Sequence, residues 1–196
     1  MKNKARVILG ALAPSLPALA LAHPGGFAEH AHAGFTSGLL HPLTGVDHLA
    51  AMLAVGVWSA LALRPVWLAP LAFIALLAAG ALAGFAGLAV PAVEPMIAAS
   101  LLVIGLLIAT RARLPLGLAV ALAGGFAAFH GAAHGFELGG HGAGSALAGM
   151  LVSTAALHLA GIGLGYAVFS RRRWLSASAG GAVALLGSAL LLRMAI

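Results

Sequence analysis

Two histidines and an aspartate lie close together at the head of a long apolar stretch, where they could bind a divalent metal ion. They are His41, Asp47 and His48. At about 100° per residue, His41 and His48 fall on one face of a helix, so both imidazoles can point into one cavity. Asp47 is displaced by one step around the helix. It must therefore either orient a histidine or bind from the helix flank, which a local distortion at Gly45 would permit.

A polar helix cap just outside a membrane is the alternative interpretation of this group. It suits His41, which stands directly before Pro42. It does not suit Asp47 and His48, because only about ten more apolar residues follow them and a spanning helix needs about 20. Ionisable side chains inside a membrane are costly, so their presence indicates a functional site.

A second group of the same chemistry stands at the end of a later apolar segment. It consists of His130, His134 and Glu137, whose spacing places all three on one stripe of a helix. At a rise of about 1.5 Å per residue, His130 lies about 22 Å along its helix. By the same rise, His48 lies roughly 16 Å along a helix of the opposite direction. The two groups therefore reach a similar depth, and we expect them to share one site between two helices.

Two further candidate residues, His158 and Glu94, lie in or beside the apolar segments. His158, about 20 Å into the fifth segment, is either a deeper metal station or a buried, hydrogen-bonded histidine. Glu94 stands between Pro91 and Pro95, where it would gather cations or simply belong to a turn.

The composition is that of an integral membrane protein. Of the 196 residues, 62% are hydrophobic and 7% are charged, and the mean hydropathy is +1.09. An ordinary water-soluble domain is excluded. The formal charge of +6 would suggest a nucleic-acid partner in a soluble protein, but these arginines stand at the ends of apolar segments, so we expect no nucleic acid. Cysteine is absent, so any metal must be held by nitrogen and oxygen ligands.

The first 22 residues have the pattern of a cleaved secretory signal peptide. A basic start leads into an apolar core and an Ala-x-Ala ending at Ala22. The alternative, an uncleaved first span, is disfavoured because the segment is short and contains Pro14 and Pro17.

A short tail, residues 23–36, follows the predicted cleavage point. Cleavage would make His23 the new N-terminus, whose free amine and imidazole could bind a metal together. His30 and His32 are either further ligands or incidental residues of a solvated tail.

Six apolar segments make up the remaining domain, residues 37–196. Each is near the ~20 residues that a helix needs to cross a bilayer, and the alternating pattern of a β-barrel is absent. We therefore expect an all-α bundle of six transmembrane helices. The segments run roughly over residues 37–63, 66–90, 95–110, 115–135, 145–169 and 174–196.

Charged residues in the connections indicate the orientation. Arginines follow the first, third and fifth segments, at Arg64, at Arg111 and Arg113, and at residues 171–173. The second and fourth connections carry no arginine. By the positive-inside rule, the arginine-bearing connections are cytoplasmic and both ends of the mature chain lie outside.

Pairs of glycines four residues apart predict that the helices pack closely. Such small residues allow two helix backbones to approach one another. For the same reason we expect the first and fourth helices to approach at Gly45 and Gly131. The pairs are Gly80 and Gly84, Gly131 and Gly135, and Gly161 and Gly165.

The two metal-binding motifs resemble those of the HupE/UreJ hydrogenase and urease accessory proteins. The first reads His41-x5-Asp47-His48, with Ala51-Met52 and Val55-Gly56 after it, and the second reads Phe129-His130-Gly-x-Ala-His134-Gly-x-Glu137. The resemblance covers essentially the whole mature chain. It implies a permease of the bacterial inner membrane that imports nickel, in some members cobalt, for metalloenzyme maturation. It also implies that the six ionisable residues of the two motifs handle the metal.

Three classes of function are compatible with these residues. We favour a permease, which needs binding that is strong enough to capture an ion and weak enough to release it. The rivals are an intramembrane zinc-type metallohydrolase and a metal sensor or chaperone that does not transport. The expected partners are the lipid bilayer and a divalent ion, Ni²⁺ or Co²⁺, as substrate, and a homo-oligomer is possible. We expect no enzymatic activity, because no serine or carboxylate beyond the ligands stands in an obvious general-base position.

Overall fold

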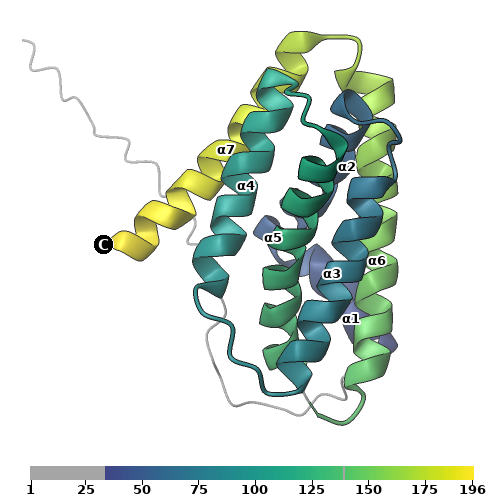
Figure 1. The fold of residues 1–196 in the computed structure, drawn as a ribbon, viewed down its shortest axis with the longest axis vertical. Helices are drawn as coiled ribbons and strands as arrows, with labels where there is room; N and C mark the ends of the chain where they lie inside the picture. The colour runs from purple at the N-terminus through teal and green to yellow at the C-terminus, as the bar shows by residue number, and fades with distance from the viewer. Residues whose placement is uncertain (1–33, 139) are drawn as a thin grey trace, which may run out of the picture. The chain divides into compact units, whose positions relative to one another are not determined.

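The computed structural model describes residues 34–138 and 140–196, which form a bundle of helices without a β-strand (Figure 1). This confirms the all-α class. The predicted signal peptide and tail, with His23, His30 and His32, lie outside the described residues. The elements are α1 (Phe35–Thr44), α2 (Val46–Ala62), α3 (Leu68–Phe85), α4 (Val93–Thr110), α5 (Leu116–Glu137), α6 (Ala143–Leu164), the short π-helix η1 (Gly165–Phe169) and α7 (Arg173–Ala195).

The lengths and apolarity of these helices fit a multi-pass membrane protein. Among the described residues, five helical segments are long and apolar enough to span a bilayer, namely α3, α4, α5, α6 with η1, and α7. The pair α1 and α2 passes the same test when taken together, which gives up to six spans. The predicted segments therefore correspond to the observed helices, with the exception of the first.

The first apolar segment is not the single helix that we expected over residues 37–63. It breaks at Gly45 into α1 and α2, whose axes differ by 86°. Gly45 has extended backbone angles, φ −96° and ψ 121°, which end one helix and begin the next. Pro42 lies inside α1 and has no N–H to donate, so the last turn before the break is already weakened. The bend leaves His41, in the last turn of α1, near His48, in the first turn of α2, with ring centroids 6.4 Å apart.

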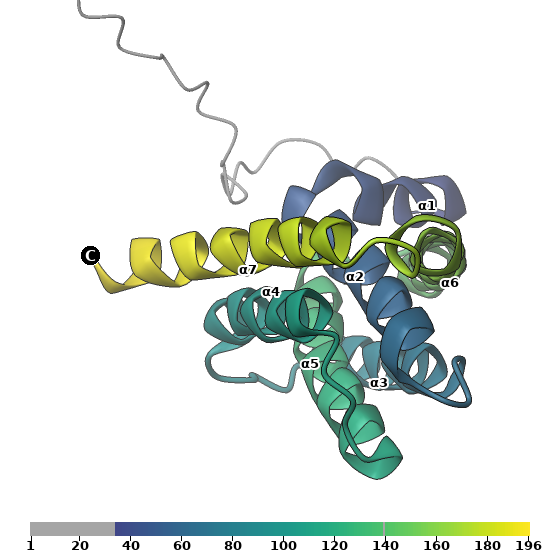
Figure 2. The ribbon, with the colours of Figure 1, turned by 90° about the horizontal axis from the view of Figure 1, so that it is seen from above.

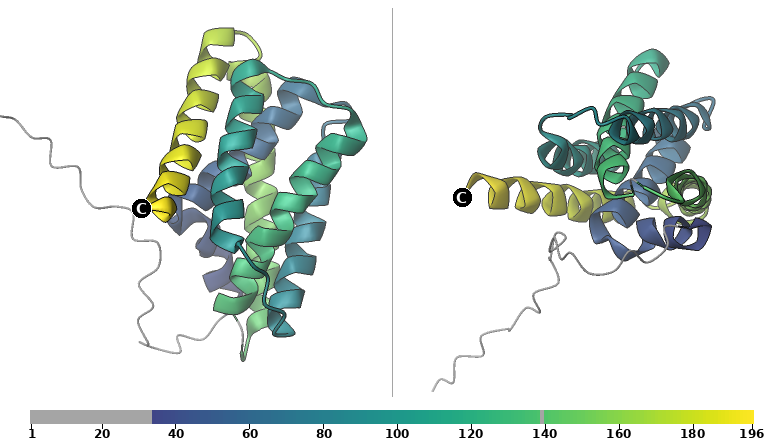
Figure 3. Two further views of the ribbon diagram at one scale, coloured as in Figure 1. Left: turned by 60° about the vertical axis from the view of Figure 1, so that its left-hand side comes forward. Right: turned by 90° about the horizontal axis from the view of Figure 1, so that it is seen from below.

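Two helix pairs and one group of three account for most of the packing. Helix α5 packs mainly on α3, α7 packs on α4, and α6 packs on both α1 and α2. The view from above shows α7 lying along α4 at one side of the bundle (Figure 2). The views of Figure 3 show α1 beside α6.

Glycines make these contacts close, as the sequence predicted. A Cβ added at Gly131 would overlap the Leu77 carbonyl of α3, and one at Gly80 would overlap the Ala128 carbonyl of α5. Gly161 of α6 lies equally close to the carbonyl of Leu53 in α2. These helices therefore approach backbone to backbone, which only a residue without a side chain allows.

The expected approach of Gly45 to Gly131 is not a direct backbone contact. Gly131 faces α3, and the nearest atoms to an added Cβ at Gly45 belong to Asp47 and His48 of its own segment. The first segment and α5 therefore meet through side chains rather than through a small-residue backbone contact. Room for several imidazoles remains between them.

The arginine-bearing connections gather at one end of the bundle, which is the upper end in Figure 1. There the indole Nε1 of the buried Trp58 donates to the carbonyl oxygen of Ala112 at 3.1 Å. Arg111 donates to the hydroxyl of Ser176 at 2.9 Å and to the carbonyl oxygen of Phe169. These bonds tie the ends of α2, α4 and α7 together. The opposite end carries the α3–α4 and α5–α6 connections.

Candidate metal site

Three potential metal ligands meet where the end of α1 approaches the end of α5. The Nε2 atom of His41 lies 2.9 Å from Nδ1 of His134 and 3.3 Å from Oε2 of Glu137. The same Glu137 oxygen lies 3.4 Å from Nδ1 of His134. Among the described residues, these three form a group whose ligand atoms all lie within 4.8 Å of one another. We call His41, His134 and Glu137 the outer group.

The spacing within the outer group is that of ligands around one ion. Metal–nitrogen bonds of about 2.1 Å place neighbouring ligand atoms roughly 3.0 to 3.4 Å apart in octahedral or tetrahedral geometry. The three observed separations lie between 2.9 and 3.4 Å. The group can therefore hold a divalent cation without a large movement of its side chains.

His48, in the first turn of α2, is held in one tautomer by its neighbour. The carboxylate oxygen Oδ1 of Asp47 accepts the Nδ1–H of His48 at 3.0 Å and the backbone N–H of His48 at 2.9 Å. With its proton on Nδ1, the imidazole has a lone pair on Nε2. That atom is buried and has no hydrogen-bond partner. Asp47 therefore orients a histidine, which is the first of the two roles that the sequence left open.

His130, one turn before His134 on α5, is oriented in a similar way by a serine. The Ser100 hydroxyl donates to the carbonyl oxygen of Ile97 at 2.6 Å, so its oxygen is left to accept the Nε2–H of His130 at 3.1 Å. The proton on Nε2 leaves a lone pair on Nδ1, and Nδ1 is buried without a partner. A buried nitrogen without a partner is costly in a protein, and a metal ion would satisfy it.

His48 joins the outer group to His130. Its ring centroid lies 4.6 Å from that of His134, 5.2 Å from that of His130 and 6.4 Å from that of His41. The rings of His41 and His134 are also 4.6 Å apart. The four imidazoles are therefore continuous, as expected from two helices that reach a similar depth. We call His48 and His130 the inner group.

Exposure is highest at Glu137 and lowest at His130, the two ends of the cluster on α5. The side chain of Glu137 is 36% exposed and that of His41 is 20% exposed, whereas His134 is 2% exposed. His130 is fully buried. Glu137 and His130 are seven residues apart on α5, a rise of about 10 Å. The cluster thus leads from the end of the bundle into its interior.

His158 lies beyond the inner group, and a phenylalanine separates the two. The Phe73 ring centroid is 5.6 Å from that of His130 and 5.1 Å from that of His158. Nδ1 of His158 donates to the carbonyl oxygen of Met52 at 3.1 Å, and its buried Nε2 has no partner. His158 is therefore buried and hydrogen-bonded, and it also presents a free lone pair.

Sequence reasoning missed two residues of this site. Ser100 and Phe73 contact the histidines directly but carry no charge, so neither stood out within its apolar helix. Ser100 is a polar residue in the middle of α4, which is the only signal that could have drawn attention to it. Glu94 is exposed in the first turn of α4, and neither of its two predicted roles is tested.

Comparisons with known proteins give a consistent result. A family model described as HupE / UreJ protein matches residues 11–190. The chain is also similar to Protein HupE of Rhizobium leguminosarum bv. viciae, with 43% identity over 192 residues. That match covers 96% of this chain and 97% of the relative. The search of solved structures found no match.

Proposed function

The chain belongs to the HupE/UreJ family, and we propose that it is a permease that imports Ni²⁺, and with lower preference Co²⁺, across the bacterial inner membrane. The metal would serve hydrogenase or urease maturation. This is a family of accessory transport proteins rather than of enzymes. One observation carries the proposal: potential metal ligands form a continuous series. The series begins at the partly exposed Glu137, continues through the imidazoles and ends at the fully buried His130.

The ligand chemistry supports a borderline divalent cation. Imidazole nitrogens suit nickel, cobalt and zinc, whereas magnesium prefers oxygen ligands and sheds its waters reluctantly. Asp47 and Glu137 supply two negative charges to the cluster, which balance a 2+ ion. We therefore expect nickel and then cobalt to be transported, and magnesium to be excluded.

The arrangement also supports movement of the ion rather than permanent binding. The outer group offers three ligand atoms, and the inner group offers two nitrogens whose lone pairs are free. Each group leaves coordination positions for water, so neither is the closed four-ligand site of a structural metal. An ion would pass from His41, His134 and Glu137 to His48 and His130. His158, past Phe73, would be a deeper station.

Metal uptake in cells tests the proposal. The protein would be expressed in a host that lacks its own nickel importer, and uptake of radiolabelled nickel would be followed. We expect His48→Ala and His134→Ala each to abolish uptake while the protein remains in the membrane, because each removes a ligand from the same path. Equal uptake by cells that carry the empty vector would contradict the permease assignment.

The double variant tests whether the two groups act as one unit. Residues that serve a single path are not additive, so His48→Ala with His134→Ala should be no worse than either change alone. His30→Ala, in the predicted tail, is the matched control and should cost far less, because a collecting residue only raises the local concentration. Independent, partial and additive losses would show that the two motifs serve separate purposes.

A further inference from the structure

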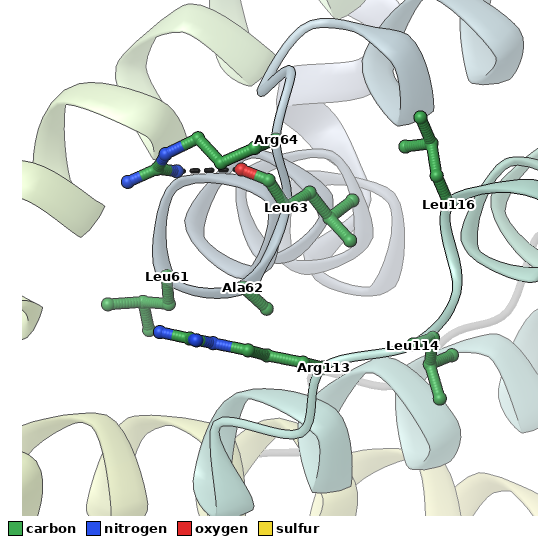
Figure 4. Close-up of a pocket in the computed structure, with 7 residues that line it drawn as sticks. All are labelled: Leu61, Ala62, Leu63, Arg64, Arg113, Leu114 and Leu116. Carbon is green, nitrogen blue, oxygen red and sulfur yellow. Dashed lines mark hydrogen bonds between the residues drawn. The ribbon is translucent and has the colours of Figure 1, made fainter.

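The arginine-bearing end of the bundle, opposite to the histidine cluster, contains a cavity of about 350 Å³. A volume of this size is in the range of small-ligand pockets. Its lining combines two arginines with apolar side chains, and Figure 4 shows Arg64 and Arg113 on opposite sides of residues 61–63. The lining residues are chiefly Arg64, Arg113, Leu61, Leu63, Leu114 and Leu116.

A second cavity of about 350 Å³ adjoins the first. It shares Leu61 and Arg113 with the first cavity and adds Arg111 and Arg173 to the lining. Arg113 therefore contributes to both cavities, and Figure 4 shows its side chain running past Leu61. The combined space is thus lined by arginines from the α2–α3 connection, from the α4–α5 connection and from the start of α7.

These positive charges have no carboxylate near them among the described residues. The acidic residues of that part of the chain are Asp47, Glu94 and Glu137, and all three lie toward the opposite end of the bundle. Arg111 and Arg64 already have partners within the chain: Arg111 donates to Ser176 and Phe169, and Nη1 of Arg64 donates to the carbonyl oxygen of Leu63 at 2.6 Å. The positive charges of Arg113 and Arg173 could therefore be balanced by an anion from outside the chain.

Exposed aromatic residues mark this end as the level of the lipid headgroups. Trp67 is 56% exposed, Trp174 is 62% exposed and Tyr166 is 44% exposed. They stand just before α3, at the start of α7 and in η1, so all lie near the arginines. Tryptophan and tyrosine gather where a membrane meets water. The cavities therefore open at the depth where phospholipid phosphates lie.

We propose that these cavities bind the phosphate of an anionic phospholipid. Arg113 would contact the phosphate, because a guanidinium offers paired N–H donors that match its oxygens. Arg64 would add the N–H groups that Leu63 does not accept. Leu114 and Leu116 would contact the first carbons of the acyl chains. A basic pocket between membrane helices is a known kind of site for anionic headgroups. Neither the topology signal nor the metal path requires such a pocket.

Thermal unfolding of the purified full-length protein in detergent tests the site. The probes are phosphatidylglycerol, phosphatidylcholine and inorganic phosphate. We expect phosphatidylglycerol alone to raise the unfolding temperature, and native mass spectrometry to detect it as a bound lipid. Arg113→Gln should weaken its apparent affinity about fivefold, which corresponds to the loss of one basic contact. Leu114→Trp, which fills the cavity without a change of charge, should weaken it as well.

Arg171→Gln is the matched control, because Arg171 is exposed at the same end and lines neither cavity. It should bind phosphatidylglycerol like the unchanged protein. An equal loss of affinity in Arg171→Gln would show that diffuse surface charge, rather than this site, attracts the lipid. Stabilisation by inorganic phosphate alone would mean an anion site without lipid, and equal stabilisation by phosphatidylcholine would mean a non-specific apolar effect. Each of these results would overturn the proposal.

Discussion

At the scale of single residues, the hydrogen bond of Asp47 decides which nitrogen of His48 can bind a metal. An asparagine in its place can present an N–H where the carboxylate accepts one, so the imidazole would lose its fixed tautomer. We expect Asp47→Asn to lower nickel uptake about 10- to 100-fold, the usual effect of removing a partner that orients a ligand. The amount of protein in the membrane should not change. Ser37→Ala, an exposed change on α1, serves as the control, and near-normal uptake by Asp47→Asn would refute the role.

The imidazoles also predict how uptake depends on pH. Protonation of a histidine removes the lone pair that binds the ion. Uptake should therefore fall as the pH is lowered and recover as the pH rises again. Because protons and metal compete for the same nitrogens, a higher nickel concentration should partly restore uptake at acid pH. Initial uptake rates at fixed membrane potential provide the measurement, and a rise in uptake at acid pH would contradict the prediction.

At the scale of the helices, glycine contacts hold the site in place. A methyl group added at Gly131 would press on the Leu77 carbonyl of α3, whereas one added at Gly125, on the same helix, would meet open space. Gly131→Ala should cost roughly 1–3 kcal/mol of stability, as overpacking does. Gly125→Ala should leave stability unchanged or raise it slightly, because alanine favours a helix. Thermal unfolding of both variants in detergent provides the comparison, and equal unfolding temperatures would contradict the packing.

The sequence predicts the helices of this protein better than it predicts the bend between two of them. Apolar length and the arginines were sufficient to place the spans, because a bilayer demands about 20 apolar residues in each. The 86° turn at Gly45 was not predictable, since a glycine permits an extended backbone without requiring one. The role of Ser100 depends on contact between α4 and α5, which no local pattern reveals. The histidine motifs were found because ionisable residues are rare in apolar segments.

At the scale of the whole molecule, the distribution of arginines predicts the orientation in the membrane. The chain has no cysteine, so a single introduced cysteine can be labelled without background. Arg172→Cys should react with an impermeant reagent only after the cells are opened, because positive connections stay in the cytoplasm. Gly144→Cys, at the other end and in open space, should react in intact cells. The reverse pattern would place the histidine cluster on the cytoplasmic side and turn the proposed direction of import around.

Uptake of nickel into sealed vesicles that contain only the purified protein tests the central claim most directly. A chelator inside the vesicles traps each ion that crosses, so transport is separated from binding by a sensor or chaperone and from catalysis. We predict that the unchanged protein accumulates radiolabelled nickel above the level of protein-free vesicles, and that vesicles with His48→Ala do not. Binding of nickel to the protein without accumulation inside the vesicles would contradict the account.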